Sequence, residues 1–194
     1  MEDRQPSDVR WDATQSGILD TAGRLIAHRG VGGLTVAELA REAGVSRPTI
    51  YRNWAGADEV VRAALLQRVH ALLADVPMAD SREGIVSAVM RFSASFRSDP
   101  VYAALLDREP EVFTRYTLQR FGASQRAILQ WMAASIAAAQ AVGSVRPGEP
   151  QHIAVMMLLI AQSAILSYGT VADLIDDGSW DHELRTALDG LLRP

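Results

Sequence analysis

The stretch GVSRPTIYRNW, Gly44 to Trp54, has the pattern of a short helix that follows a tight turn. Only Val45, Ile50 and Trp54 have the helical spacing of residues that pack inward. The other side chains of this helix are expected to face water, although most of them are hydrogen-bonding groups. The expected exposed side chains are Arg47, Thr49, Tyr51 and Arg52. A short helix that exposes such groups favours a binding role.

The residues on either side complete a helix-turn-helix pattern. Thr35-Val36-Ala37-Glu38 is a capping box that predicts a helix over 36–42. Gly44 falls where the turn needs a positive φ angle, and Ser46 is placed to cap the next helix. Pro48 lies in the first turn of that helix, where it removes no intrahelical hydrogen bond. The predicted shared core consists of Leu39, Ala43, Val45 and Ile50.

Two such helices at a steep angle place the second one in the major groove of DNA. Arg47 can donate two hydrogen bonds to guanine. Thr49 can form a hydrogen bond with a base edge or contact thymine through its methyl group. Tyr51 and Arg52 suit phosphate contacts, as does the capped helix start at Thr35. The predicted DNA-binding residues are Thr35, Ser46, Arg47, Pro48, Thr49, Tyr51 and Arg52.

The run SGILDTAGRLIAHRGVGGLTVAELAREAGVSRPTIYRNWAGADEVVRAAL, residues 16–65, resembles the DNA-binding region of tetracycline-repressor-like (TetR) regulators. The resemblance implies an all-helical homodimer of about nine helices. It also implies a C-terminal part that binds a small effector and dimerises, usually through the last two helices. The family commonly has a Lys where this sequence has Asp58 and Glu59, so no side-chain phosphate contact is carried over there. A backbone N–H group at that helix start could still serve.

The composition is compatible with DNA binding and excludes some other kinds of site. The chain has 194 residues, 48% of them hydrophobic, and a net charge of −4. A negative total does not exclude DNA, because the local distribution of charge decides the contact. The absence of cysteine excludes disulfides and thiolate metal sites. The N-terminal MEDRQPSD lacks the pattern of a secretory signal, so a cytoplasmic location is expected.

No period-2 alternation is present, which predicts an all-α fold of about nine helices. We expect two domains: 1–56, the N-terminal arm and helix-turn-helix domain, and 57–194, a helical effector-binding and dimerisation domain. The further predicted helices cover about 13–29, 58–75, 82–97, a segment opened by Asp99-Pro100, 110–142 with a break near Gly122 left open, 151–171 and 180–192.

The C-terminal part offers candidates for a dimer interface and an effector pocket. The uncharged stretches 127–145 and 150–172 approach the length of a membrane span, but their polar side chains favour helices buried in protein, without a membrane partner. Helices near 151–171 and 180–192 could form a four-helix bundle with a second copy, the alternative being an ordinary monomer core. The scarcity of charge favours a small, mainly apolar effector. The predicted pocket residues are Met90, Phe96, Tyr102, Phe113, Tyr116, Trp131, Met156 and Gln162.

Catalysis finds little support, so we expect no enzyme, no metal and no cofactor. The four His fall on separate helices without metal-ligand spacing, and no nucleophile or phosphate-loop motif is present. We predict a sequence-specific transcriptional regulator, a ligand-responsive repressor acting as a homodimer on a palindromic operator. Two alternatives stay open: a ligand-responsive helical module that works through a protein partner, and a helical enzyme.

Overall fold

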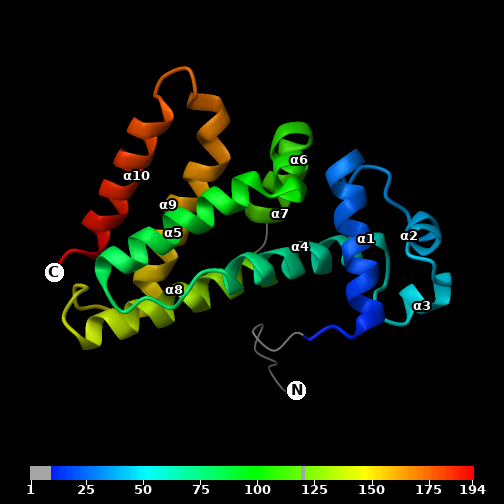
Figure 1. Ribbon diagram of the computed structural model, residues 1–194, viewed down its shortest axis with the longest axis horizontal. Coiled ribbons are helices and arrows are strands. Elements are labelled where there is room, and N and C mark those ends of the chain that lie inside the picture. Colours follow the sequence, from blue (N-terminus) through cyan, green and yellow to red (C-terminus); the bar gives the residue numbers. More distant parts are fainter. Residues whose placement is uncertain (1–9, 119–120) are drawn as a thin grey trace. The chain divides into compact units, whose positions relative to one another are not determined.

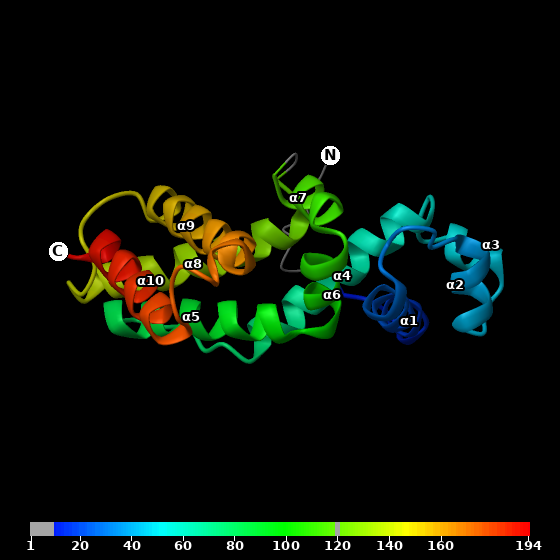
Figure 2. The same ribbon diagram turned by 90° about the horizontal axis from the view of Figure 1, so that it is seen from above.

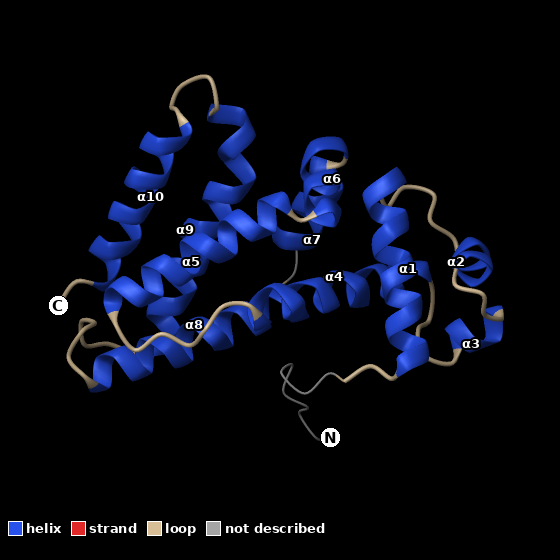
Figure 3. Ribbon diagram, in the orientation of Figure 1, coloured by secondary structure: helices blue, strands red, loops and turns tan. Residues whose placement is uncertain are grey.

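The computed structural model describes residues 10–118 and 121–194, without the side chains of 116–118, and all regular structure in this part is helical (Figure 3). This confirms the predicted all-α fold. The described part contains ten helices instead of about nine, because the region after residue 110 divides near Gly122. The helices (Figure 1) are α1 Ala13–Arg29, α2 Val36–Glu42, α3 Arg47–Tyr51, α4 Ala57–Ala74, α5 Arg82–Ser98, α6 Pro100–Arg108, α7 Pro110–Leu118, α8 Ala123–Ala141, α9 Pro150–Val171 and α10 Asp177–Leu192.

The chain forms two compact units. The first contains the residues through Ala71 together with Ser98–Ser124, and so holds α1, α2, α3, most of α4, α6 and α7. The second contains Leu72–Arg97 and Gln125–Pro194, and so holds α5, α8, α9 and α10. The predicted domain boundary after residue 56 concerns which part binds DNA, so it stays a prediction.

Side-chain caps fix where several helices begin. Asp12 and Gln15 form a complete capping box at α1, with Gln15 N–H 2.8 Å from Asp12 Oδ1 and Asp12 N–H 2.9 Å from Gln15 Oε1. At α10 the carboxylate of Asp176 accepts the N–H of Ser179 at 3.0 Å. This cap explains why α10 begins at Asp177, about three residues before the predicted start near Trp180.

A carboxylate from the α6–α7 junction holds the loop between α1 and α2. Glu109 accepts the backbone N–H groups of Val31 at 2.5 Å and Gly32 at 2.9 Å. Gly30 ends α1 with a φ of +79°, and a Cβ there would lie 2.6 Å from the Glu109 carboxylate. Next to it, Arg108 Nη1 donates to a carbonyl oxygen in the last turn of α1 at 2.8 Å. The C-terminal end of α6 is therefore fixed to the end of α1.

The other end of α6 is fixed to α4. Asp99 is only 4% exposed and caps α6 by accepting the N–H of Val101 at 3.0 Å. The same carboxylate forms an ion pair with Arg68 of α4. The hydroxyl of Tyr102 donates to the carbonyl oxygen of Leu65 in α4 at 2.7 Å. Polar contacts thus anchor both ends of α6 within the first unit.

Replacing Glu109 with Ala should lower the free energy of unfolding by about 1–3 kcal/mol, because two hydrogen bonds to a charged acceptor are lost. Urea unfolding at neutral pH measures this change. The matched control is Glu111→Ala, since Glu111 is exposed in the first turn of α7 and contributes about 0.3–1 kcal/mol at most. Equal losses in the two variants would contradict the anchoring role of Glu109.

Tyr102 gives stability a specific dependence on alkaline pH. Burial raises the pKa of the Tyr102 phenol above its ordinary value of 10.0, and the charge of Asp99 raises this pKa further. The neutral phenol therefore stabilises the fold below pH 10, and this stability is lost as pH rises above 10 because the unfolded chain ionises first.

Tyr102→Phe should lose about 1 kcal/mol at pH 7, because the hydrogen bond to Leu65 is missing. At a pH about one unit above the ordinary tyrosine pKa, this difference should shrink, because the variant has no phenol to ionise. Urea unfolding at both pH values measures it. Tyr51→Phe serves as control, since that ring is 56% exposed. A constant difference between Tyr102→Phe and the wild type would contradict the expectation.

Candidate nucleic-acid interface

A glycine turn joins α2 to α3. Gly44 has a φ of +67°, which confirms the predicted positive angle. The N–H of Val45 donates to the carbonyl of Ala40 at 2.9 Å, and the N–H of Gly44 donates to that of Arg41 at 3.3 Å. This pair of bonds is a Schellman motif, which satisfies the last carbonyl groups of α2 and reverses the chain. The chain therefore enters α3 in a fixed direction.

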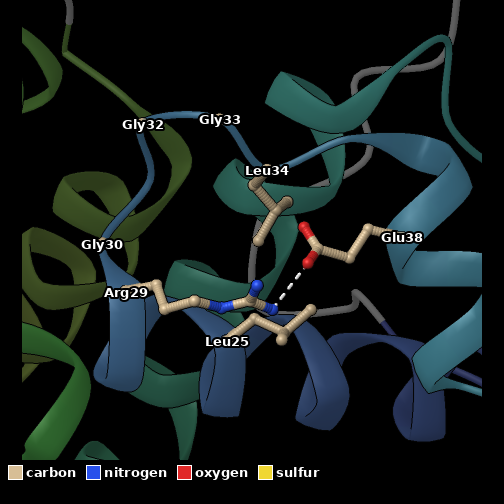
Figure 4. Close-up of a pocket in the computed structure, with 7 residues that line it drawn as sticks. All are labelled: Leu25, Arg29, Gly30, Gly32, Gly33, Leu34 and Glu38. Carbon is tan, nitrogen blue, oxygen red and sulfur yellow. Dashed lines mark ion pairs between the residues drawn. The ribbon is translucent and has the colours of Figure 1, made fainter.

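At the start of α2, one of the two contacts of the predicted capping box is present, and Glu38 makes a different contact. Thr35 Oγ1 accepts the N–H of Glu38 at 3.2 Å, as expected. The Glu38 carboxylate, however, lies 2.6 Å from Arg29 Nη2, so it forms an ion pair with the end of α1 (Figure 4). In Figure 4 the Arg29 side chain extends past Leu25 toward Glu38. The α1–α2 pairing is therefore stabilised by a charge contact that the capping pattern did not indicate.

A small hollow lies beside this ion pair. Its open volume is about 50 Å³, far below the roughly 300–1,000 Å³ of ligand pockets. Two of its residues, Arg29 and Glu38, already neutralise each other. The hollow is therefore no candidate for the effector site. It is lined by Leu25, Arg29, Gly30, Gly32, Gly33, Leu34 and Glu38.

The α3 helix buries its apolar side and caps its own start. Ile50 is completely buried and Trp54 is 7% exposed, as predicted, in a core shared with α1, α2 and α4. Ser46 Oγ accepts the N–H of Thr49 at 3.3 Å and lies 2.8 Å from Thr49 Oγ1. The Thr49 hydroxyl is therefore partly used by the cap, and Thr49 itself is half-buried.

The predicted DNA-binding residues lie on the surface that α3 leaves open. We define the reading face as Arg47, Thr49, Tyr51 and Arg52. In residues 10–118 and 121–194, no acidic side chain forms an ion pair with Arg47 or Arg52. Arg41 of α2, by contrast, lies 2.9 Å from Glu42. Thr35, Ser46 and Pro48 are also exposed.

Two residues that the sequence did not single out support the reading face. Gln15 Nε2 of α1 donates to Asn53 Oδ1 at 2.9 Å, across 38 positions of sequence. Asn53 Nδ2 in turn donates to the carbonyl of Thr49 at 3.1 Å. This bridge ties the end of α3 to the start of α1. No local pattern could have revealed it, because isolated polar residues carry no pairing signal.

An acid of α4 binds the chain segment just before this helix begins at Ala57. Glu59 Oε2 accepts the N–H of Ala55 at 2.6 Å, and Asp58 is exposed next to it. A phosphate could use the N–H of Ala55 only by displacing Glu59. At one of these two acids the departure from the family pattern therefore has a structural role, because Glu59 holds the segment that leads into α4.

The predicted pocket residues are divided between the two units. Tyr102 and Phe113 are buried in the first unit and pack edge to face, with ring centroids 6.1 Å apart. Tyr116 lies in α7, but its side chain is outside the described residues. In the second unit Met90 and Phe96 are buried, Trp131 and Gln162 are half-buried, and Met156 is 49% exposed. Their assignment to one pocket stays a prediction.

Comparison with known proteins supplies the family. The model of bacterial regulatory proteins of the tetR family matches residues 18–64, the helix-turn-helix region described above. An HTH-type transcriptional regulator of Mycobacterium bovis is 36% identical over 180 residues, which cover 92% of this chain and 94% of that protein.

Solved structures show the same fold. A TetR-family regulator from Rhodococcus has a TM-score of 0.68 at 22% identity, covering 92% of this chain and 98% of its own. RolR in complex with resorcinol has a TM-score of 0.65 at 14% identity, covering 92% of this chain and 87% of its own.

The family consists of DNA-binding regulators and not of enzymes, in agreement with the prediction that the chain is not an enzyme. Its helix-turn-helix, its all-helical fold and a relative of 36% identity along nearly its whole length agree with one another. The chain therefore belongs to the TetR family of bacterial regulatory proteins and is a DNA-binding transcriptional regulator.

Proposed function

We propose that this regulator is a ligand-responsive repressor that binds a palindromic operator as a homodimer. The observation that carries the proposal is the reading face, on which exposed arginines without acidic partners stand on a helix anchored by Ile50. Such a regulator acts where the bacterial chromosome lies, so we place it in the cytoplasm.

Each residue of the reading face has a proposed role. Arg47 would form two hydrogen bonds to guanine in the major groove. Thr49 would contact a thymine methyl group with its own methyl, since its hydroxyl is shared with Ser46. Tyr51 and Arg52 would bind phosphates. Thr35, Ser46 and Pro48 would lie at the two helix starts that approach the DNA backbone.

The second copy would bind on α9 and α10, which follow each other as a helical hairpin (Figure 1). In the described part of the chain, α9 is the one helix long and apolar enough to cross a membrane, yet only 28% of that stretch is buried. Met156 is 49% and Leu159 50% exposed. We assign this face to a second copy and not to lipid, because His152 and Ser163 are also exposed on α9 and lipid would leave them unsatisfied.

On α10 the interface would use few apolar residues. Leu188 is completely buried within its own chain, so it is not on the surface. Leu184 and Leu191 are half-buried, and Ala187 is exposed. Two hairpins related by a twofold axis would form a four-helix bundle. The two reading faces would then meet half-sites about 34–36 Å apart.

Release from DNA would come from a small effector. RolR, which shares the fold, binds resorcinol, and this supports a small, mainly apolar ligand here. The effector would bind more tightly to the conformation in which the two reading faces are wrongly spaced for the operator. Its affinity difference between the two conformations would set the extent of release.

Replacing Arg47 with Ala should weaken binding to the operator by about 1–3 kcal/mol and relax the preference at one base pair. Tyr51→Phe should weaken binding to operator and scrambled DNA alike, because a phosphate contact carries no sequence information. Fluorescence anisotropy with labelled DNA at two salt concentrations measures both effects. Arg126→Ala is the matched control, since Arg126 is exposed on α8 in the other unit. Unchanged operator affinity in both variants would exclude α3 as the reader.

Leu159→Arg should convert the dimer into a monomer, because it places a charge in the proposed apolar interface. Sedimentation velocity measures the change in mass. Val142→Arg makes the same substitution at a residue that is 68% exposed just after α8, so the dimer should persist. A dimer that survives Leu159→Arg, or one that Val142→Arg disrupts equally, would place the interface elsewhere.

A further inference from the structure

Three buried side-chain polar atoms have no hydrogen-bond partner in the described part of the chain: Arg68 Nε, Ser93 Oγ and Trp131 Nε1. Arg68 is accounted for, since another nitrogen of its guanidinium forms the ion pair with Asp99. Ser93 and Trp131 both belong to the second unit, and no such contact explains them. An unpaired buried polar group costs free energy, so each such group calls for a reason.

Ser93 lies in the middle of an apolar stripe of α5. It is 5% exposed and stands three residues from both Met90 and Phe96, which are themselves buried. Residues three apart share a helix face, so the hydroxyl faces the same surroundings as these two side chains. A helical serine commonly donates to the carbonyl one turn earlier, but the Ser93 hydroxyl has no such partner. Its hydrogen-bonding capacity is therefore unused in the described part of the chain.

Trp131 on α8 is half-buried as a whole, but its indole nitrogen is buried and has no hydrogen-bond partner in the described part of the chain. The two helices run in opposite directions within the second unit (Figures 1 and 2). The N–H of Arg82 donates to Ser144 Oγ at 2.8 Å, which places the start of α5 beside the segment after α8. At about 1.5 Å per helical residue, Ser93 lies about 17 Å along α5 from Arg82, and Trp131 lies about 15 Å back from Ala141, where α8 ends. The two unpaired groups thus occur at a similar level of the same unit.

The chemistry of the two groups defines the ligand. The indole N–H of Trp131 can only donate, and the hydroxyl of Ser93 can donate as well. In the described part of the second unit the buried polar residues are Ser93 and Ser135, and neither is charged. A charged ligand would therefore find no buried countercharge there. One carbonyl oxygen has two lone pairs and can accept from both donors.

We propose that Ser93 and Trp131 are the polar contacts of the effector site, and that they recognise an uncharged, mainly apolar molecule through a carbonyl oxygen. The inference rests on the proposed effector-dependent function and specifies the chemistry of its site. Met90 and Phe96 supply apolar surface on either side of Ser93.

The test compares ligands that differ only in the carbonyl oxygen. The probes are acetophenone against ethylbenzene and benzophenone against diphenylmethane, titrated into the full-length protein by calorimetry. The variants are Ser93→Ala, Trp131→Phe and the double substitution. Ser135→Ala and Trp180→Phe are matched controls. Ser135 accepts the N–H of Ala79 at 3.5 Å, and Trp180 packs against Tyr168 with ring centroids 5.5 Å apart.

The wild type should bind at least one ketone about tenfold or more tightly than its hydrocarbon partner, as expected for donors that would otherwise stay unpaired. The double variant should lose this preference, and both controls should keep it. The proposal is overturned if no ketone binds the wild type, if the wild type does not prefer ketones, or if the preference survives the double substitution.

Thermal unfolding of the ligand-free protein tests the same proposal independently of any ligand. Ser93→Ala should leave the thermal midpoint unchanged or raise it, because it removes an unpaired buried group. Ser135→Ala should lower the midpoint. If Ser93→Ala lowers it as much as Ser135→Ala does, the Ser93 hydroxyl has a partner within the fold and the proposal fails.

Operator binding, measured on the same samples, separates this site from the proposed function. A wild type that prefers ketones but binds no operator would refute the repressor and leave the ligand site supported. A wild type that binds its operator and shows no ketone preference would refute the ligand site alone.

Discussion

Five residues are too few for a helix to persist in water, so the geometry of α3 depends on the side chains that it buries. Ile50 is completely buried among residues of α1, α2 and α4, including Ile18 and Leu39, which are 1% and 0% exposed. A large apolar side chain stabilises by about 1.5–3 kcal/mol when it is buried. The direction of the reading face is therefore set by hydrophobic packing beneath it. Its two arginines, Arg47 and Arg52, form no ion pair in the described part of the chain.

Polar contacts extend this rigidity beyond the helix-turn-helix. Glu109 binds the loop that leads from α1 to α2, and Asp99 joins the opposite end of α6 to Arg68 of α4. Both anchors use charged acceptors, which form stronger hydrogen bonds than neutral ones. A displacement of α6 would therefore be transmitted to the end of α1 and to the loop before α2. An effector that moved α6 would act on the reading face through these contacts.

Features that depend on neighbouring residues were predictable from the sequence. The Gly44 turn, the Ser46 cap and the burial of Ile50 follow from spacing and backbone preference, and the structure has all three. Contacts between distant segments were not predictable. The Gln15–Asn53 bridge spans 38 positions and the contact of Glu109 with Val31 spans 78, and single polar residues at such distances carry no periodic signal.

The effector site shows the same limit. Met90 and Phe96 were predicted as pocket residues, whereas Ser93 between them was not singled out. Its burial without a hydrogen-bond partner became visible only in three dimensions. At the start of α2, the sequence correctly predicted that Thr35 accepts the N–H of Glu38. It did not predict that the Glu38 carboxylate pairs with Arg29, because the position of Arg29 relative to α2 depends on the fold.

The central claim is that α3 reads a DNA sequence in each of two symmetric subunits. The most direct measurement uses fluorescence anisotropy to compare how tightly the purified protein binds two DNAs, each at two salt concentrations. One is the DNA just upstream of its own gene, and the other is a scrambled version of that DNA. We expect a dimer that binds the upstream DNA tightly, prefers it to the scrambled DNA, and binds both more weakly at higher salt. Equal affinity for the two DNAs, or no binding at either salt concentration, would contradict the claim.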